Sequence, residues 1–102
     1  MAIFFVAYSL HDATRQYQHF FAELEGLAAF MAQRSLWLVD YDASARDLRN
    51  LLARHLDEHD ELFVDRLSPD WTSWGMQTCR EWVQGRRKKG GAAANQRGGT
   101  AY

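Results

Sequence analysis

IFFVAYSL, residues 3–10, is an almost unbroken apolar run, and with histidine counted as neutral the first charged side chain is Asp12. Its aromatic and β-branched residues favour a strand over a helix. Alternate side chains of a strand point to opposite faces, and both sets here are apolar: Ile3, Phe5 and Ala7 on one face, Phe4, Val6 and Tyr8 on the other. Such a strand belongs in the middle of a sheet, with both faces covered.

The composition is that of one globular domain. The chain has 102 residues, 47% hydrophobic and 14% aromatic, which excludes a disordered protein. Cys79 is the single cysteine and cannot form an intrachain disulfide, so we expect a cytoplasmic protein. No cationic segment precedes the first apolar run, and no apolar run approaches the ~20 residues of a spanning helix, so neither a signal peptide nor a membrane contact is expected.

The charge is unevenly distributed. All 13 acidic residues precede Gly85, whereas residues 85–102 carry basic side chains among glycine and small polar residues. We expect this segment to be a flexible basic tail. It is the only part of the chain suited by charge to nucleic acid, through Arg86, Arg87, Lys88 and Lys89, although such runs are more often simply solvated.

A helix is expected after the first strand. Asp12 or Thr14 can cap its start, and an apolar stripe with helical spacing follows at Tyr17, Phe20, Phe21 and Leu24. Gly26 is predicted to end it.

Residues 27–33 allow two interpretations. Their apolar positions continue the helical spacing, so one longer helix is an alternative to a short strand paired with the next one. The Gln33–Arg34 junction lacks the residues of a tight hairpin turn, so the local sequence does not decide.

The next elements are clearer. SLWLVD, residues 35–40, is predicted to be a strand, and Ser44 with Asp47 forms a loose capping box for a leucine-striped helix. A polar turn at 57–61 leads to a strand at 62–67, which Asp65 and Arg66 mark as an edge. Ser68-Pro69-Asp70 has the pattern of a helix start, with a tryptophan face beyond it that Gly75 can interrupt.

The predicted order is βαββαβ, an α+β ferredoxin-like sandwich with a C-terminal tryptophan-rich helix. We expect a domain at 1–84 and the flexible basic tail at 85–102.

Four motifs give the chain a family resemblance: AYSL at 7–10, SLWLVD at 35–40, LDEHDELFV at 56–64 and DWTSWG at 70–75. Over residues 1 to about 84 the sequence resembles the Cas-two superfamily, the small ferredoxin-like subunits of CRISPR adaptation and their VapD toxin relatives, and in particular the stand-alone SinR-like branch. The resemblance favours the second strand at 27–33 and implies a homodimer.

The residues also point to a dimer, because two helices cover only one face of a sheet whose inner strands are apolar on both. The alternative cover is the tryptophan helix folding back. The residues expected at the interface are Phe4, Val6, Tyr8, Trp37, Trp71, Trp74 and Trp82.

The resemblance also implies a metal-binding aspartate at the end of the first strand, paired across the dimer. Ser9 occupies that position here, and a neutral hydroxyl is a poor ligand for Mg²⁺. Asp12 could substitute from the loop, although a helix cap is its simpler role. We therefore predict no metal site and no cofactor; Mg²⁺ is needed only if the protein is a nuclease.

Two other motifs have simple structural interpretations. His55, Asp57 and His59 form H-x-D-x-H, which suggests a metal site, but a solvated turn is the default. Cys79 lies among apolar residues without a neighbouring base, so packing is its expected role.

The leading hypothesis is a non-catalytic dimeric interaction module of a defence or mobile-element system that binds another protein. The alternatives are an endoribonuclease of the VapD toxin type, with Asp12 or His11 as the acting group, and a nucleic-acid binder that uses the basic tail.

Overall fold

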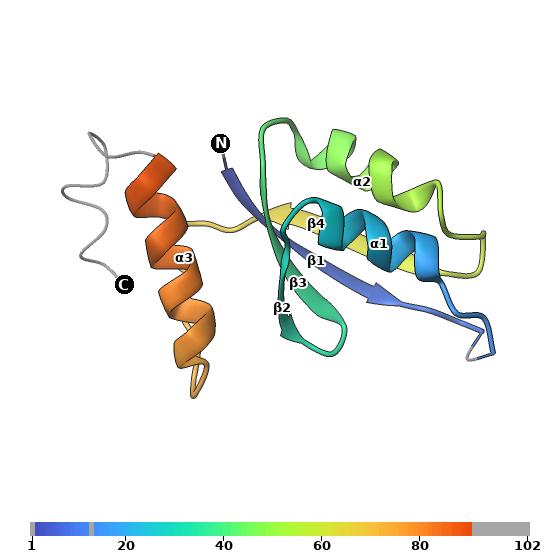
Figure 1. The fold of residues 1–102 in the computed structure, drawn as a ribbon, viewed down its shortest axis with the longest axis horizontal. Helices are drawn as coiled ribbons and strands as arrows, with labels where there is room; N and C mark the ends of the chain where they lie inside the picture. The colour runs from blue at the N-terminus through green and yellow to red at the C-terminus, as the bar shows by residue number, and fades with distance from the viewer. Residues whose placement is uncertain (1, 13, 91–102) are drawn as a thin grey trace. The chain divides into compact units, whose positions relative to one another are not determined.

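The structure is a computed structural model that describes residues 2–12 and 14–90. The elements in chain order are β1 (Ala2–Ser9), α1 (Gln18–Gly26), β2 (Phe30–Gln33), β3 (Leu36–Tyr41), α2 (Ala45–Ala53), β4 (Glu61–Arg66) and α3 (Gln77–Gly90) (Figure 1). The chain divides into two units, one ending at Arg66 and one beginning at Leu67. The α+β class is confirmed. Among the described helices, none has the length and apolar character needed to cross a bilayer.

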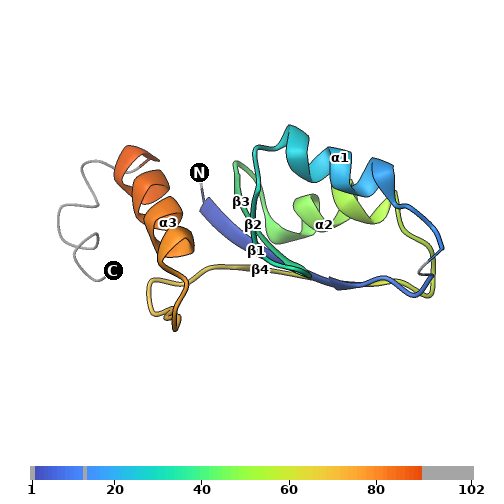
Figure 2. The same ribbon diagram turned by 60° about the horizontal axis from the view of Figure 1, so that its bottom comes forward.

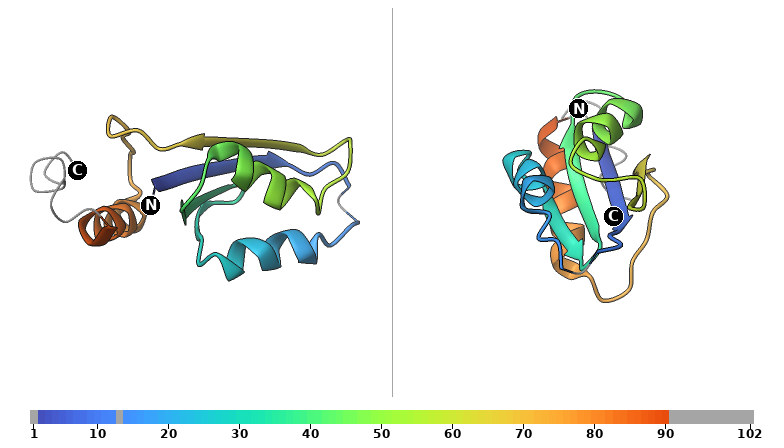
Figure 3. Two further views of the ribbon diagram at one scale, coloured as in Figure 1. Left: turned by 90° about the horizontal axis from the view of Figure 1, so that it is seen from above. Right: turned by 90° about the vertical axis from the view of Figure 1, so that its right-hand side faces the viewer.

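The sheet is antiparallel with the strand order β2-β3-β1-β4. The apolar run at residues 3–10 forms β1, which lies inside the sheet between β3 and β4 as predicted (Figure 3). In its register Val6 lies opposite both Trp37 of β3 and Val64 of β4. The other strands, β2 and β4, are the edges, and the polar residues of β4 agree with its position.

The core lies between one face of the sheet and the pair α1 and α2, which lie on the same side of it (Figure 2). Phe20 and Leu24 of α1 and Leu48 and Leu52 of α2 are fully buried. The sheet side chains beneath them are Phe4, Val6 and Tyr8 of β1 together with Trp37 and Val39 of β3.

The interface expected at Phe4, Val6, Tyr8 and Trp37 is therefore wrong, because these side chains belong to the core beneath the helices. Tyr8 and Trp37 also satisfy each other's polar atoms: Trp37 Nε1 donates to the Tyr8 hydroxyl at 2.9 Å. The sequence of a strand that is apolar on both faces does not show which face the helices of the same chain will cover. The interface was assigned to the face that α1 and α2 cover.

The opposite face of the sheet carries Ile3, Phe5 and Ala7 of β1. The Phe5 ring stacks on that of Phe63 of β4, with the centroids 5.8 Å apart and the planes at 12°. Ile3 and Leu38 on this face are buried, whereas Phe63 is 61% exposed. The exposed apolar surface of this face is thus aromatic and lies along the β1–β4 pair.

The ambiguous segment after α1 resolves into a helix end and a short strand. Ala28 adopts a left-handed conformation with φ 55°. The Ala28 amide donates to the Glu25 carbonyl at 3.0 Å and the Ala29 amide to the Leu24 carbonyl at 3.1 Å, the pattern of a Schellman motif. Ala28 therefore occupies the left-handed position that was predicted for Gly26.

The hairpin between β2 and β3 is fixed by long-range contacts. Its turn lies at Arg34 and Ser35. The Tyr8 hydroxyl donates to the Arg34 carbonyl at 3.0 Å and the Tyr8 amide to the Ser35 carbonyl at 3.3 Å. A turn held by another strand needs no local turn residues, which explains why residues 33–35 carry no hairpin signal.

Of the remaining predictions about the fold, one is confirmed and two are wrong. The capping box of α2 is confirmed, since the Asp47 amide donates to Ser44 Oγ at 3.1 Å. The helix start at Ser68-Pro69-Asp70 is wrong: these residues form a turn, and α3 begins at Gln77 after Gly75 takes φ 77°. The flexible segment expected from Gly85 is helical as far as Gly90, and residues 91–102 lie outside the described part of the chain.

We predict that Ala28→Gly stabilises the protein. An alanine in the left-handed region costs about 1–2 kcal/mol that glycine avoids, partly offset by the greater freedom of glycine in the unfolded chain. The expected gain in unfolding free energy is about 0.5–1 kcal/mol, measured by urea denaturation. Ala29→Gly, one residue later and outside that conformation, should destabilise instead. Equal destabilisation by both changes would contradict the assigned helix end.

Candidate functional site

The register of β1 and β4 brings two loops together at one end of the sheet. Because the strands are antiparallel and Ser9 lies opposite Glu61, residues just after β1 meet residues just before β4. The resulting loop cluster consists of His11, Arg15 and Tyr17 from the first loop and Asp57 and Asp60 from the second.

Asp60 is the centre of the loop cluster. Its side chain has 0% exposure. Its Oδ1 accepts from the Tyr17 hydroxyl at 2.7 Å, from the His11 amide at 3.0 Å and from His11 Nδ1 at 2.9 Å, and its Oδ2 accepts from the Asp57 amide at 3.0 Å. Burial alone would raise the pKa of Asp60, but the hydrogen bonds from the Asp57 and His11 amides and from the two side chains hold that pKa well below its usual range. Asp60 is therefore an ionised carboxylate.

His11 is oriented by this carboxylate. The hydrogen bond to Asp60, with smaller contributions from the charges of Asp57 and Asp12, raises the pKa of His11 against a modest opposing effect of burial. Nδ1 faces Asp60, so proton exchange with a ligand would use Nε2, and the side chain is 38% exposed. The His59 ring lies 5.3 Å from the His11 ring, centroid to centroid. The imidazoles of His11 and His59 are therefore neighbours at this cluster.

Arg15 ties the two loops together. One Nη donates to Asp57 Oδ2 at 3.1 Å and the other to the His55 carbonyl at 3.0 Å, while the guanidinium covers the Tyr17 ring at 4.7 Å. Tyr17 itself adopts a left-handed conformation with φ 52°, which is strained for an aromatic residue. Packing, charge and hydrogen bonding together hold this backbone in place.

The cluster contains the residue types of a metal site, but its carboxylate oxygens already have protein partners. Ligand atoms of His11, Asp57 and Asp60 lie within 4.8 Å of one another. A divalent cation would need the neutral form of His11 and would displace Arg15 from Asp57 and Tyr17 from Asp60. The existing donors already satisfy these carboxylates, so the arrangement suits proton transfer better than metal binding.

The sequence-predicted residues are not brought together. Ser9 is exposed at the end of β1. Asp12 does not cap α1; its Oδ1 accepts from the Thr14 amide at 3.0 Å, which closes a local turn. Of the H-x-D-x-H residues, His55 departs to Glu23, with Nε2 3.0 Å from Glu23 Oε1, whereas Asp57 and His59 both lie beside His11. Only His11 of the predicted catalytic candidates joins the cluster.

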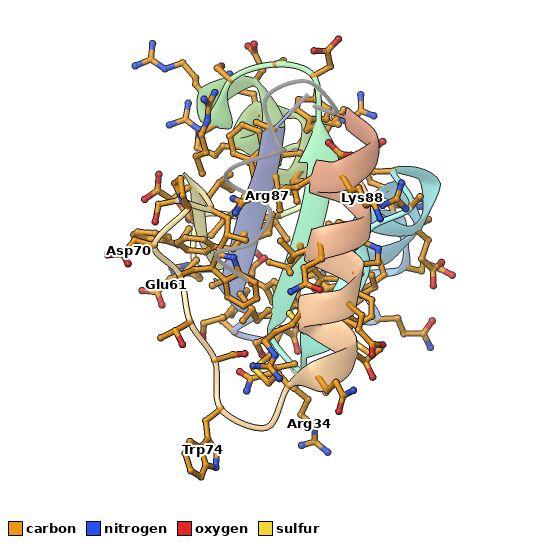
Figure 4. The ribbon with its side chains drawn as sticks, turned by 90° about the vertical axis from the view of Figure 1, so that its left-hand side faces the viewer. Arg34, Glu61, Asp70, Trp74, Arg87 and Lys88 are labelled. Carbon is orange, nitrogen blue, oxygen red and sulfur yellow. The ribbon has the colours of Figure 1, made fainter. Side chains whose placement is uncertain are left out.

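The second unit holds the other predicted residues. Trp74 is 96% exposed and projects from the loop that precedes α3 (Figure 4). On α3 the Arg86 guanidinium lies 5.0 Å from the Trp82 ring centroid, and an Arg87 Nη donates to the Leu67 carbonyl at 2.7 Å. Cys79 is buried, and burial raises the pKa of its thiol, as expected for a packing residue. Nucleic-acid binding by the basic run stays a prediction.

Asp60 and Arg15 are the site residues that the sequence analysis missed. Asp60 falls within the polar turn predicted at 57–61, and Arg15 precedes the predicted helical stripe that begins at Tyr17. The available signal was the strand pairing itself: once β1 and β4 are neighbours, His11, two residues after Ser9, and Asp60, one residue before Glu61, both lie just beyond the Ser9–Glu61 pair.

Comparison with known proteins finds no matching family model and no matching solved structure. The Cas-two-like resemblance therefore depends on the sequence motifs alone.

The loop cluster predicts a characteristic pH dependence of stability. His11 has a raised pKa, so its contribution is complete below the ordinary imidazole value and is lost as pH rises through the folded value. Asp60 has a lowered pKa, so its contribution is complete above the ordinary carboxyl value and is lost as pH falls through the folded value. The contact between them should stabilise most between about pH 4 and 6.5.

We expect His11→Asn to lower the thermal midpoint most within that window and progressively less at higher pH, measured by circular dichroism. His19→Asn, on the exposed side of α1, serves as the matched control and should leave the pH profile unchanged. A His11→Asn deficit that is constant from pH 4 to 9 would show that the imidazole charge does not contribute.

Proposed function

We propose that the protein is a small cytoplasmic interaction module of the Cas-two-like kind that forms a homodimer through the sheet face opposite α1 and α2. The observation that carries the proposal is the exposed ring of Phe63, stacked on the half-buried ring of Phe5 on that face. The strand order β2-β3-β1-β4 with two helices on one face is consistent with a ferredoxin-like arrangement. Ser9, in place of an aspartate, supports a role that requires no metal cofactor.

A second copy is the favoured occupant of this face. Aromatic side chains are preferred at the centre of interfaces, where they bury large areas with little loss of conformational freedom. The stack lies next to Ala7, a small side chain that leaves room for a ring from a partner. Trp74, in the second unit, supplies a separate exposed anchor for a different protein.

Phe63→Lys should convert the dimer to a monomer. A charge at the centre of the proposed seam would be desolvated without a partner, so the dissociation constant should rise at least about tenfold. Met31→Lys is the matched control: Met31 is also strongly exposed, at 57%, but it pairs with Trp37, which faces the helices. Sedimentation equilibrium measures both. A wild-type chain that is monomeric at all concentrations, or a Phe63→Lys dimer of unchanged affinity, would refute the proposal.

A second candidate function, RNA cleavage without a metal, is favoured by the two imidazoles of the loop cluster. His11 is oriented by a buried carboxylate, and His59 lies beside it. One neutral imidazole would take the proton of a ribose 2′-hydroxyl while its oxygen forms a bond to phosphorus. The other, protonated, would give its proton to the departing 5′-oxygen as the P–O5′ bond breaks. The products would be a 2′,3′-cyclic phosphate and a 5′-hydroxyl.

This candidate predicts RNA cleavage that persists in EDTA and stops when the scissile ribose is 2′-deoxy. His11→Ala and His59→Ala should each lower the rate about 10²- to 10⁴-fold, and the rate should pass through a maximum with pH. Arg49→Ala, which removes a side chain outside the cluster that bonds only to its neighbour Asn50 in the described contacts, is the control. Cleavage that requires Mg²⁺, or that survives loss of both imidazoles, would exclude the mechanism.

A further inference from the structure

A cavity of about 350 Å³ lies where the start of α1 meets the end of α2. Its size is at the lower end of the range for small-molecule sites. Two arginines and two imidazoles line it, namely Arg15, Arg54, His19 and His55, with Gln16, Gln18, Tyr17 and Phe20 completing the wall. No carboxylate is among these lining residues.

Each of the two arginines is held in position by a carboxylate that does not line the cavity. Arg54 donates one Nη to Glu23 Oε1 at 2.6 Å, and Arg15 donates one Nη to Asp57 Oδ2 at 3.1 Å. Arg15 also donates its other Nη to the His55 carbonyl at 3.0 Å. Each guanidinium carries five N–H donors in a fixed plane, so both arginines keep donors for a ligand. The side chains are 59% and 40% exposed, so a ligand in the cavity can reach them.

The imidazoles form a flat wall of the same cavity. The rings of His19 and His55 stack with centroids 6.2 Å apart and planes at 22°. His55 Nε2 contacts Glu23 Oε1 at 3.0 Å, so Glu23 orients His55 as well as Arg54. Glu23, which does not line the cavity, therefore positions two side chains that do, Arg54 and His55.

The start of α1 adds donors of the same kind. Among the described residues, no side chain caps this helix, and its first turn contains no acidic residue. The first helical hydrogen bond runs from the Phe21 amide to the Tyr17 carbonyl at 3.1 Å, so the amides of Gln18, His19 and Phe20 precede the bonded part of the helix. These three residues line the cavity. Their amides and the positive end of the helix dipole favour an anion there.

We propose that this cavity binds a phosphate group, either as free phosphate or as the terminal phosphate of a small phosphate monoester. The convergence of Arg15, Arg54 and the two imidazoles on one cavity carries the proposal, and the helix amides agree with it. A tetrahedral dianion matches this set better than a carboxylate, because it offers three terminal oxygens to guanidinium and amide donors on different sides. The site is separate from the seam at Phe63. It shares Arg15 and Tyr17 with the loop cluster, but phosphate binding requires neither dimer formation nor RNA cleavage.

The test is a ¹H–¹⁵N NMR titration of the full chain with sodium phosphate and with ribose 5-phosphate, against sodium chloride at matched ionic strength. We expect saturable shifts at Gln18, His19 and Phe20 with both phosphates and none with chloride. Tighter binding of ribose 5-phosphate would identify a monoester as the ligand, and equal binding would identify free phosphate. Shifts that do not saturate, or that fall on α3 instead, would overturn the proposal.

Two variants separate binding from folding. Arg54→Gln removes a cation, and Gln18→Glu adds a negative charge that stabilises the helix start while repelling phosphate. Each should weaken phosphate binding at least about tenfold, the loss expected for a charge-assisted hydrogen bond. Arg49→Gln on the same helix is the control, because Arg49 bonds to Asn50 and does not line the cavity. Unchanged affinity in a folded Gln18→Glu protein would refute the site.

Discussion

The antiparallel pairing of β1 with β4 is the constraint on which the rest of the structure depends. Its register places Ala7 opposite Phe63, which lets Phe5 stack diagonally on Phe63 on the face away from the helices. The same register places Ser9 opposite Glu61, which brings His11 to Asp60 beyond the ends of the strands. One set of backbone hydrogen bonds thus creates both the aromatic surface and the charged loop cluster. A shift by one residue would move Phe63 to the core face and separate the two loops.

Most of the fold follows from patterns that act over a few residues. Aromatic and β-branched runs identified β1 and β3, and the Ser44–Asp47 box identified the start of α2. The failures occur where distant contacts decide. The left-handed residue that follows α1 is Ala28 rather than Gly26, and the turn at Arg34 is held by Tyr8. Ser68-Pro69-Asp70 has the local pattern of a helix start, yet these residues form a turn. The helix α3 begins only at Gln77, after Gly75 adopts a positive φ.

The candidate site was less predictable than the fold because its members are far apart in sequence. His11 and Asp60 are separated by 49 residues, and Arg15 reaches Asp57 across 42. The H-x-D-x-H motif suggested a site because its residues are close in sequence, but only Asp57 and His59 lie beside His11, and His55 contacts Glu23 instead. Spacing along the chain predicts a site only within one helix or strand. Here the relevant distance was set by strand pairing.

One face of the sheet is covered by α1 and α2, and the other face carries an aromatic strip formed by Phe5 and Phe63. The loop cluster lies at one end of the sheet, and the cationic cavity lies between the two helices. The central claim is that a second copy covers the aromatic strip. Isotope-filtered NOE spectroscopy on a mixture of labelled and unlabelled chains tests it most directly. The account predicts intermolecular contacts from the rings of Phe5 and Phe63 and none from Phe4 or Val6. Intermolecular contacts confined to other surfaces, or their complete absence at millimolar concentration, would contradict it.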